Sequence, residues 1–181
     1  HPEPYAAGGL SGADEAAGDC GSFRVRAGDV LFHDAFGAHL DRFPRSGAEI
    51  LNLPLPLEFT PLSMLGRVSD ANRLVRAAER DQAEATLLLL AAPIEPLAHA
   101  IADWPDQLAA DVIRDPSLRL GTWAQAMDLI PSAVSRGFER VFGIAPSAFR
   151  ARARGRQAWR AITTTDEPLA EIAANLGFAD Q

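Results

Sequence analysis

The sequence predicts an α+β protein, in which a β-rich beginning is followed by an all-α region. Three observations lead to this prediction. Residues 22–33 alternate between apolar and polar side chains, as half-buried strands do. From residue 70 onward, apolar residues recur at three- and four-residue spacing, which is typical of amphipathic helices. Near the end of the chain, a helix-turn-helix pattern occurs once in full and once in part.

Residues 1–58 are expected to form short strands. The segment SFRVRAGDVLFH predicts two strands joined by a tight turn at Ala27-Gly28-Asp29, and AEILNLPLPL predicts another strand. Alternate residues of a strand point to opposite faces, so Leu31 and His33 share one face and Phe32 takes the other. If Leu31 points into the interior of a barrel, His33 does so too; if Phe32 does, His33 is solvated.

Residues 59–104 predict a helical linker or dimerisation region, carried by DANRLVRAAERDQAEATLLLLAAP. No apolar run reaches the roughly 18 residues that span a bilayer, so we expect no membrane partner. The single cysteine, Cys20, cannot form an internal disulfide and fits a reducing cytoplasm.

Residues 105–164 predict a complete helix-turn-helix unit followed by a long linker helix. Trp123 and Ala124 form the inner face of one short helix, the turn comes at Asp128, and Pro131 opens the next helix. In that second helix Val134, Phe138 and Val141 fall on one face and should be buried. The opposite face should carry Ser132, Ser135, Arg136, Glu139 and Arg140.

Residues 165–181, TDEPLAEIAANLGFADQ, predict the start of a second unit. Asp166 is a candidate helix cap, Pro168 suits a first turn, and Gly177 suits the turn at the end of the helix. The following helix would lie beyond Gln181, so we expect the second unit to be incomplete here. We also expect the native chain to begin before His1.

The charge distribution indicates where a polyanion would bind. The formal net charge of −7 argues against indiscriminate binding to nucleic acid. Residues 119–160, however, hold eight arginines and only two acidic residues. This basic block coincides with the first helix-turn-helix unit and its linker helix. A solvated helix face or a helical interaction module does not need such a cluster, whereas binding to phosphates does.

Residues 119–181 resemble the DNA-binding domain of AraC-type transcription regulators, through EPLAEIAANLGFADQ and GIAPSAFRARARGRQA. That family joins two helix-turn-helix units by a long helix, and each unit places a recognition helix in the major groove. Two departures concern the first unit. Asp128 stands where the family usually has glycine, and Ile130 stands where it has a capping serine. Asp tolerates the left-handed conformation, but Ile cannot accept a capping hydrogen bond.

The resemblance implies which side chains meet DNA. Base edges would be contacted by Ser132, Ser135 and Arg136, of which Arg136 can reach two acceptors of a guanine. Phosphates would be contacted by Arg140, Arg150 and Arg152. The implied partners are double-stranded DNA, RNA polymerase if the protein activates transcription, and a second copy of the chain in a homodimer. The implied location is the cytoplasm of a bacterium, in association with the nucleoid.

The segment GDVLFHDAFGAHLDRF resembles the later part of a cupin sensor barrel, a domain that in this family usually binds a small effector or mediates dimerisation. Gly28 and His39 match the glycine and the metal-ligand histidine of the second cupin motif. Asp34, Phe36 and Phe43 replace the proline, glycine and asparagine of that motif. Residues 1–58 are too few to close an eight-stranded barrel, so we expect a partial cupin-like barrel or sandwich.

The cupin resemblance leaves a second functional class open, a metal-dependent cupin enzyme with a helical appendage. Its candidate metal ligands are His1, Glu3, His33 and His39. No close spacing of His, Cys, Asp and Glu completes a ligand set, so we expect no bound metal and no cofactor. The leading hypothesis from the sequence is therefore a DNA-binding regulator without enzymatic activity, and the runner-up is the cupin-type enzyme.

Overall fold

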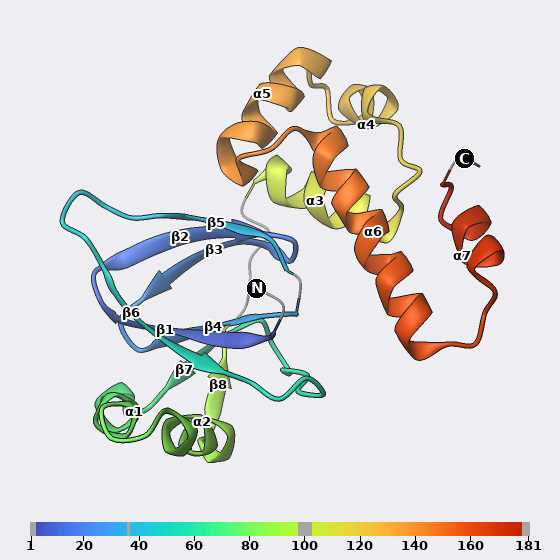
Figure 1. Cartoon of the computed structure of the whole chain (residues 1–181). Helices are drawn as coiled ribbons and strands as arrows, with labels where there is room; N and C mark the ends of the chain where they lie inside the picture. Colours follow the sequence, from blue (N-terminus) through green and yellow to red (C-terminus); the bar gives the residue numbers. More distant parts are fainter. Residues whose placement is uncertain (1–2, 36, 98–102, 179–181) are drawn as a thin grey trace. The chain divides into compact units, whose positions relative to one another are not determined.

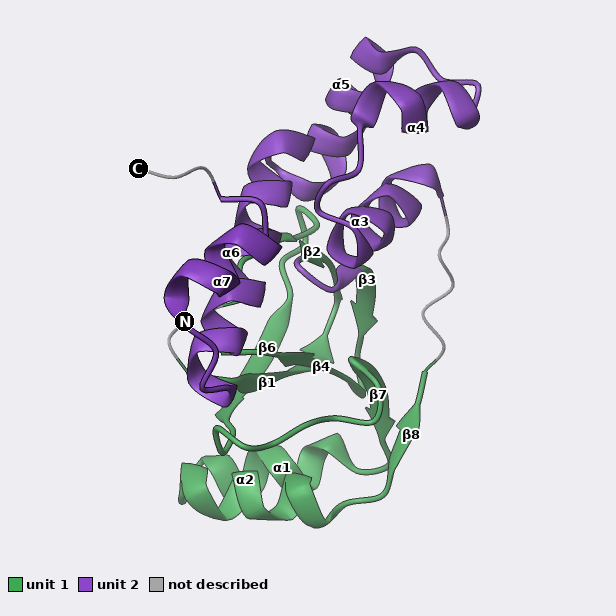
Figure 2. Ribbon diagram, turned by 90° about the vertical axis from the view of Figure 1, so that its right-hand side faces the viewer, with its two compact units in different colours: residues 1–18, 22–100 green, residues 19–21, 101–181 purple. Residues whose placement is uncertain are grey.

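The computed structural model describes residues 3–35, 37–97 and 103–178, and its elements fall into two compact units (Figures 1 and 2). Unit 1 comprises residues 1–18 and 22–100, and unit 2 comprises residues 19–21 and 101–181. Strands make up most of unit 1, together with two helices, whereas helices make up unit 2.

Two antiparallel sheets form the framework of unit 1. The larger sheet has the strand order β6-β1-β4-β7-β8, and the smaller has the order β3-β2-β5. The strands are β1 (Tyr5–Ser11), β2 (Ala13–Gly18), β3 (Gly21–Arg26), β4 (Asp29–His33), β5 (His39–Arg42), β6 (Glu49–Pro54), β7 (Leu65–Val68) and β8 (Ile94–Pro96). The two predicted strands and the tight turn between them are confirmed, because β3 and β4 are joined through Ala27 and Gly28, and Gly28 has a positive φ of 87°. The two strands do not pair with each other, since β3 belongs to the smaller sheet and β4 to the larger one.

The larger sheet has two buried faces, and the strand alternation decides which side chains go to each. On one face, α1 (Ala71–Ala78) and α2 (Gln82–Ala91) pack against the sheet (Figure 1). Asp70 and Asp81 cap these helices by accepting hydrogen bonds from Arg73 N and Ala83 N. The buried core on this face consists of Ala6, Val30, Phe32, Leu53, Leu55, Val68, Leu74, Ala77, Ala85 and Leu89.

The other face turns toward the three-stranded sheet. Leu31 on β4 packs there with Ala16, Phe23 and Val25 of the smaller sheet. Because His33 follows Leu31 by two residues, it lies on this inner face as well. Leu31 and Phe32 are thus both buried, on opposite faces of the larger sheet, and His33 lies on the face of Leu31, as in the first alternative.

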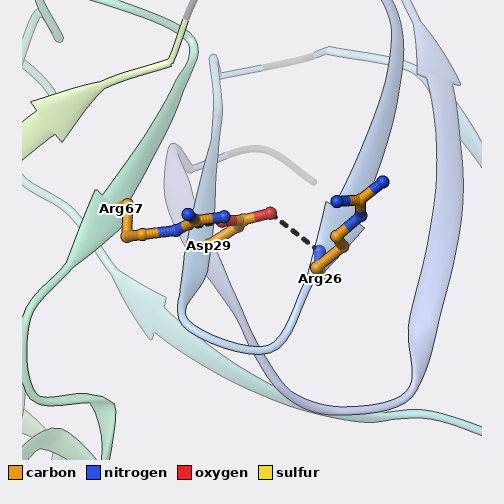
Figure 3. Close-up of polar contacts among 3 residues, drawn as sticks. All are labelled: Arg26, Asp29 and Arg67. Atoms are coloured by element: carbon orange, nitrogen blue, oxygen red, sulfur yellow. Dashed lines mark hydrogen bonds and ion pairs between the residues drawn. The ribbon is translucent and has the colours of Figure 1, made fainter.

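The turn before β4 is fixed by a buried carboxylate. Asp29 accepts a hydrogen bond from Arg26 N at 3.0 Å and pairs with the guanidinium of Arg67, whose Nη2 lies 2.7 Å from its other oxygen (Figure 3). One side chain therefore joins the end of β3, the start of β4 and the neighbouring strand β7. Such a pair satisfies a charge that would otherwise be costly to bury.

The described strands form two antiparallel sheets and no closed barrel, and the resemblance to a cupin is not confirmed. The expected extent of the β region needs correction. Strands continue beyond residue 58, because β7 pairs with β4 and β8 pairs with β7. These two strands are only four and three residues long, too short for alternation to reveal them in the sequence.

Unit 2 is built from five helices within the described residues: α3 (Trp104–Arg114), α4 (Leu120–Ala126), α5 (Pro131–Phe142), α6 (Pro146–Thr164) and α7 (Leu169–Asn175). It contains an aromatic cluster of Phe138 and Phe142 from α5 and Phe149 from α6. The ring centroids of Phe138 and Phe142 lie 4.4 Å apart, and that of Phe149 lies 5.2 and 5.3 Å from them. The predicted short helices, the long linker helix and both turns are present.

The turns use the residues that the sequence singled out. Asp128, between α4 and α5, has a φ of 54°, and it is the one non-glycine residue with positive φ in the described part of the chain. Gly143 and Gly177 take the same left-handed conformation after α5 and α7. The predicted cap at Asp166 is wrong, because α7 begins at Leu169 with Pro168 in the N-cap position.

None of the helices in the described ranges combines the length and the apolar character needed to cross a bilayer.

Candidate functional sites

The outer face of α5 is the candidate DNA-reading surface. Val134, Phe138 and Phe142 are buried, so the helix is fixed in its rotation about its own axis. Phe142 takes the fully buried place expected for Val141, which is half-buried. As a consequence, the predicted outer residues are all exposed: Ser132, Ser135, Arg136, Glu139 and Arg140.

Two contacts that the sequence did not reveal hold α5 and α4 in place. Gly137 lies against the indole of Trp104 on α3, so closely that an added Cβ would come within 2.4 Å of Trp104 Cζ2. Trp123 on α4 donates its indole N–H to Asp111 on α3 at 2.8 Å. A glycine inside a helical pattern is the signal that could have indicated a close approach, but it does not identify the neighbour.

The N-terminus of α5 has no side-chain cap. Ile130 occupies the N-cap position with extended backbone, and Pro131 begins the helix. Ala133 N–H donates to the backbone oxygen of Ile130 at 2.8 Å, but no side-chain oxygen caps the first turn or neutralises the positive end of the helix dipole. This end of a helix is suited to an oxyanion such as a DNA phosphate.

The arginines of α6 divide into exposed and anchored side chains. Arg152 is exposed. Arg150 is half-buried and donates to Leu118 O at 3.0 Å, and Arg154 donates to Pro116 O at 3.1 Å. Gln157 donates to Ile113 O at 2.9 Å in the same way. Part of the basic block therefore fixes the loop between α3 and α4, a role that charge counting does not reveal.

The basic character of the reading surface remains. The two acidic residues among residues 119–160 are Asp128 in the turn and Glu139 on α5, and both are exposed. Arg136 and Arg140, which flank Glu139 on the same helix, are exposed as well. A surface with an excess of guanidinium groups attracts the phosphate backbone at long range.

Unit 1 contains a second candidate site, a cavity of about 320 Å³ between its two sheets. A volume of this size falls in the range of small-molecule sites. Phe43 and Asn52 line it at exposed positions, and an apolar wall is formed by Ala7, Ala16, Val25, Leu31, Ala48 and Ile50. The remaining lining residues are polar: Tyr5, Asp14, His33, His39 and Asp41.

The polar side chains of the cavity form a connected group. The rings of His33 and His39 lie 4.4 Å apart, and Tyr5 stacks on His33 at 4.5 Å. His39 Nε2 lies 3.0 Å from the Tyr5 hydroxyl and 3.2 Å from a carboxylate oxygen of Asp41. His33 and His39 were singled out from the sequence, but Tyr5, Asp14 and Asp41 were not.

Burial in the cavity shifts the pKa values of three lining residues toward their uncharged forms. Burial, together with the neighbouring His39, lowers the pKa of His33 to about 4. Burial and the charge of Asp41 raise the pKa of Asp14, and the same two causes raise the pKa of Tyr5 to about 12. At neutral pH, His33 and Tyr5 are therefore uncharged hydrogen-bonding groups.

The four candidate metal ligands are not gathered into one site. His33 and His39 line the cavity, Glu3 is exposed and does not, and His1 lies outside the described residues. Across residues 3–35, 37–97 and 103–178, no three residues among His, Cys, Asp and Glu are grouped so that they could hold a metal ion.

A family model described as a helix-turn-helix domain matches residues 123–181. The match begins within α4 and extends over α5, α6 and α7, so it includes α5 with the candidate DNA-reading surface. No curated protein and no solved structure matches the chain. The match to residues 123–181 identifies a helix-turn-helix domain and supports the interpretation that it is an AraC-like domain that binds double-stranded DNA.

Proposed function

We propose that the chain is a sequence-specific transcription regulator of the AraC type, in which unit 2 reads duplex DNA and unit 1 senses a small molecule. The observation that carries this proposal is the exposed face of α5, which lies inside the helix-turn-helix match and inside the basic block. We place the protein in the cytoplasm, where a bacterial chromosome is accessible, and assign it no catalytic activity. No observation favours the cupin-type enzyme.

In this proposal α5 enters the major groove with its N-terminal half. Arg136 donates to the two acceptors of a guanine, and Ser132 and Ser135 contact neighbouring base edges. Arg140 and Arg152 bind phosphates. Arg150 was expected to bind phosphate too, and its hydrogen bond to Leu118 O assigns it first to positioning the loop, with its remaining N–H groups available for a phosphate.

A selection from random duplexes, followed by binding titrations on the selected site, tests the reading surface. Arg136→Ala should weaken the binding free energy for the selected site by about 1–3 kcal/mol and should reduce the base preference at one position of that site. Arg152→Ala should weaken all sequences alike and reduce the slope of affinity against salt by about one unit. Arg73→Ala, an exposed arginine on α1 in unit 1, is the control with the same loss of charge.

If Arg136→Ala and Arg73→Ala behave alike on both selected and random duplexes, α5 does not read bases and the proposed function is wrong. A preference that changes with Arg152 but not with Arg136 would mean that α6 is the reading helix instead. Either outcome can be read directly from the titrations.

The sensing role of unit 1 rests on its cavity. Its volume, its apolar wall and its convergent polar groups are the features of a small-molecule site. An effector that binds there with different affinity in the DNA-bound and free protein would change DNA affinity by the same factor.

A further inference from the structure

The cavity of unit 1 has a charge pattern that restricts what can bind in it. Its ionisable lining residues are two aspartates, two histidines and one tyrosine, and no arginine lines it among the described residues. The sequence contains no lysine, so no ammonium side chain can supply the missing positive charge. The carboxylates Asp14 and Asp41 therefore dominate the electrostatic field in the cavity.

Asp14 is the most informative of these groups. It is only 6% exposed, it lines the cavity from β2, and it makes no ion pair with any residue that the structure describes. The hydrogen bond to its carboxylate comes from its own backbone N–H. His39 acts on Asp14 electrostatically, but its Nε2 lies at ion-pair distance from Asp41, so Asp14 has no cationic group in direct contact within the described part of the chain. A buried carboxylate in this situation is costly, and such groups either take up a proton or bind a cation.

Asp41 extends the acidic site across the smaller sheet. It lies two residues after His39 on β5, so both side chains point to the same face, and β5 pairs with β2 next to Asp14. Burial, followed by the charge of Asp41, raises the pKa of Asp14, and the nearby His39 only partly offsets this effect. One positive charge placed between them would relieve this repulsion.

The rest of the lining indicates the shape of the cation. Val25, Leu31 and Ile50 provide an apolar wall that cannot satisfy a second charged group or a polyol. His33 and Tyr5 are neutral at pH 7 and can accept or donate hydrogen bonds near the head group. The volume of about 320 Å³ accommodates a small organic molecule rather than a bare ion.

We propose that the cavity binds a small organic cation, a primary amine with a compact apolar body, whose ammonium group lies between Asp14 and Asp41. This inference deepens the proposed sensing role of unit 1 and rests on that role for its biological meaning. The apolar body lies against Val25, Leu31 and Ile50, and an anionic ligand is excluded by the two carboxylates.

Three probes of the same shape test the charge requirement on the full chain. Benzylamine is protonated at neutral pH, benzyl alcohol is neutral, and benzoate is an anion. Isothermal titration calorimetry should show saturable binding of benzylamine, at least about tenfold tighter than benzyl alcohol, and no binding of benzoate. Equal affinity for the amine and the alcohol, preference for benzoate, or no saturable binding of the amine would overturn the proposal.

Variants then locate the charge partners. Asp14→Asn should reduce benzylamine affinity to that of benzyl alcohol, and Asp41→Asn should reduce it by a smaller factor because Asp41 also contacts His39. Asp34→Asn is the control, since Asp34 is exposed and does not line the cavity. Thermal melting of each variant shows whether it folds, and a folded Asp14→Asn protein that keeps the tenfold preference contradicts the proposal.

The titrations contain no DNA, so this inference and the proposed function can fail separately. Loss of amine binding with normal Arg136-dependent DNA recognition would overturn only the cation site. Amine binding in a protein that recognises no DNA sequence would overturn only the regulator.

Discussion

At the scale of single residues, the clearest constraint is the contact between Gly137 and Trp104. Helical glycine costs about 1 kcal/mol relative to alanine, and here the missing Cβ leaves room for the indole. In the proposed function the outer face of α5 carries the side chains that read DNA, so this inner contact would set their position. Specificity would then depend on a residue that touches no DNA.

Gly137→Ala should destabilise unit 2 by about 1–3 kcal/mol, because the added Cβ would lie 2.4 Å from Trp104 Cζ2. Gly155→Ala on α6 is the matched control, since nothing lies within 4 Å of its added Cβ. The free energy of unfolding of Gly155→Ala should rise by about 0.5–1 kcal/mol, because alanine has the higher helix propensity. Urea unfolding followed by tryptophan fluorescence measures both, because Trp104, Trp123 and Trp159 all belong to unit 2. Equal effects of the two variants would contradict the contact.

His33 makes the stability of unit 1 depend on pH. Its pKa in the folded protein is about 4, below the usual 6.5, so the unfolded chain binds more protons between these values. The free energy of unfolding should therefore fall by on the order of 3 kcal/mol as the pH falls from about 6.5 to 4. Asp14, with its raised pKa, acts in the opposite direction, because its protonation favours the folded state.

The change is measured as the melting temperature of unit 1 against pH, with circular dichroism of its strands. His33→Gln, which does not titrate, should remove the fall between pH 6.5 and 4, whereas Asp34→Asn should keep it. Around His33 the titratable neighbours are Tyr5 and His39, with Asp14 and Asp41 across the cavity. A fall of the same size in His33→Gln would assign the pH dependence to those neighbours.

At the scale of elements, α5, the proposed recognition helix, has no side-chain cap at its N-terminus. Aspartates cap α1, α2 and α3, but Ile130 precedes α5 and is 70% exposed. Its extended backbone, with φ −77° and ψ 128°, is the conformation that a capping residue uses. The uncapped end is consistent with a helix whose N-terminus is completed by a phosphate of bound DNA.

Ile130→Ser should stabilise unit 2 by about 0.5–2 kcal/mol, since its hydroxyl can accept a first-turn N–H. Ile130→Ala removes the same exposed side chain without adding an acceptor and should be close to neutral. The comparison by urea unfolding isolates the cap. A serine variant no more stable than the alanine variant would mean that the first-turn N–H groups are already satisfied.

The sequence predicted the elements that have strong local signals. Period-2 alternation identified β3 and β4, and helical spacing with Pro131, Gly143 and Pro146 identified α5 and α6. Elements held mainly by distant partners were missed, as with β7 and β8, whose residues pair with strands far away in the chain. The cavity was missed in part for the same reason, because Asp14 and Asp41 become neighbours only when β2 pairs with β5.

At the scale of the whole molecule, the candidate DNA-reading surface and the cavity lie in different units. The aromatic residues that report folding by absorbance or fluorescence are divided between the units in the same way. The three tryptophans lie in unit 2, and Tyr5, the one tyrosine of the sequence, lines the cavity of unit 1. A ligand stabilises the unit that binds it by an amount set by its concentration relative to its dissociation constant. The two units can therefore be followed separately in one sample.

Thermal melting of the full chain should respond differently to the two ligands. A random-sequence duplex of about 30 base pairs, nearly three turns of B-DNA, should raise the transition reported by tryptophan fluorescence at low salt. Benzylamine should raise the transition reported by the Tyr5 absorbance. At a concentration 100 times the dissociation constant, each ligand should raise the free energy of unfolding of its own unit by about 2.7 kcal/mol.

If benzylamine also shifts the tryptophan transition when DNA is bound, the two sites are coupled, and DNA must change the affinity for benzylamine by the same factor. If each ligand shifts only its own transition even in the presence of the other, the units are energetically independent and the cavity does not regulate DNA binding.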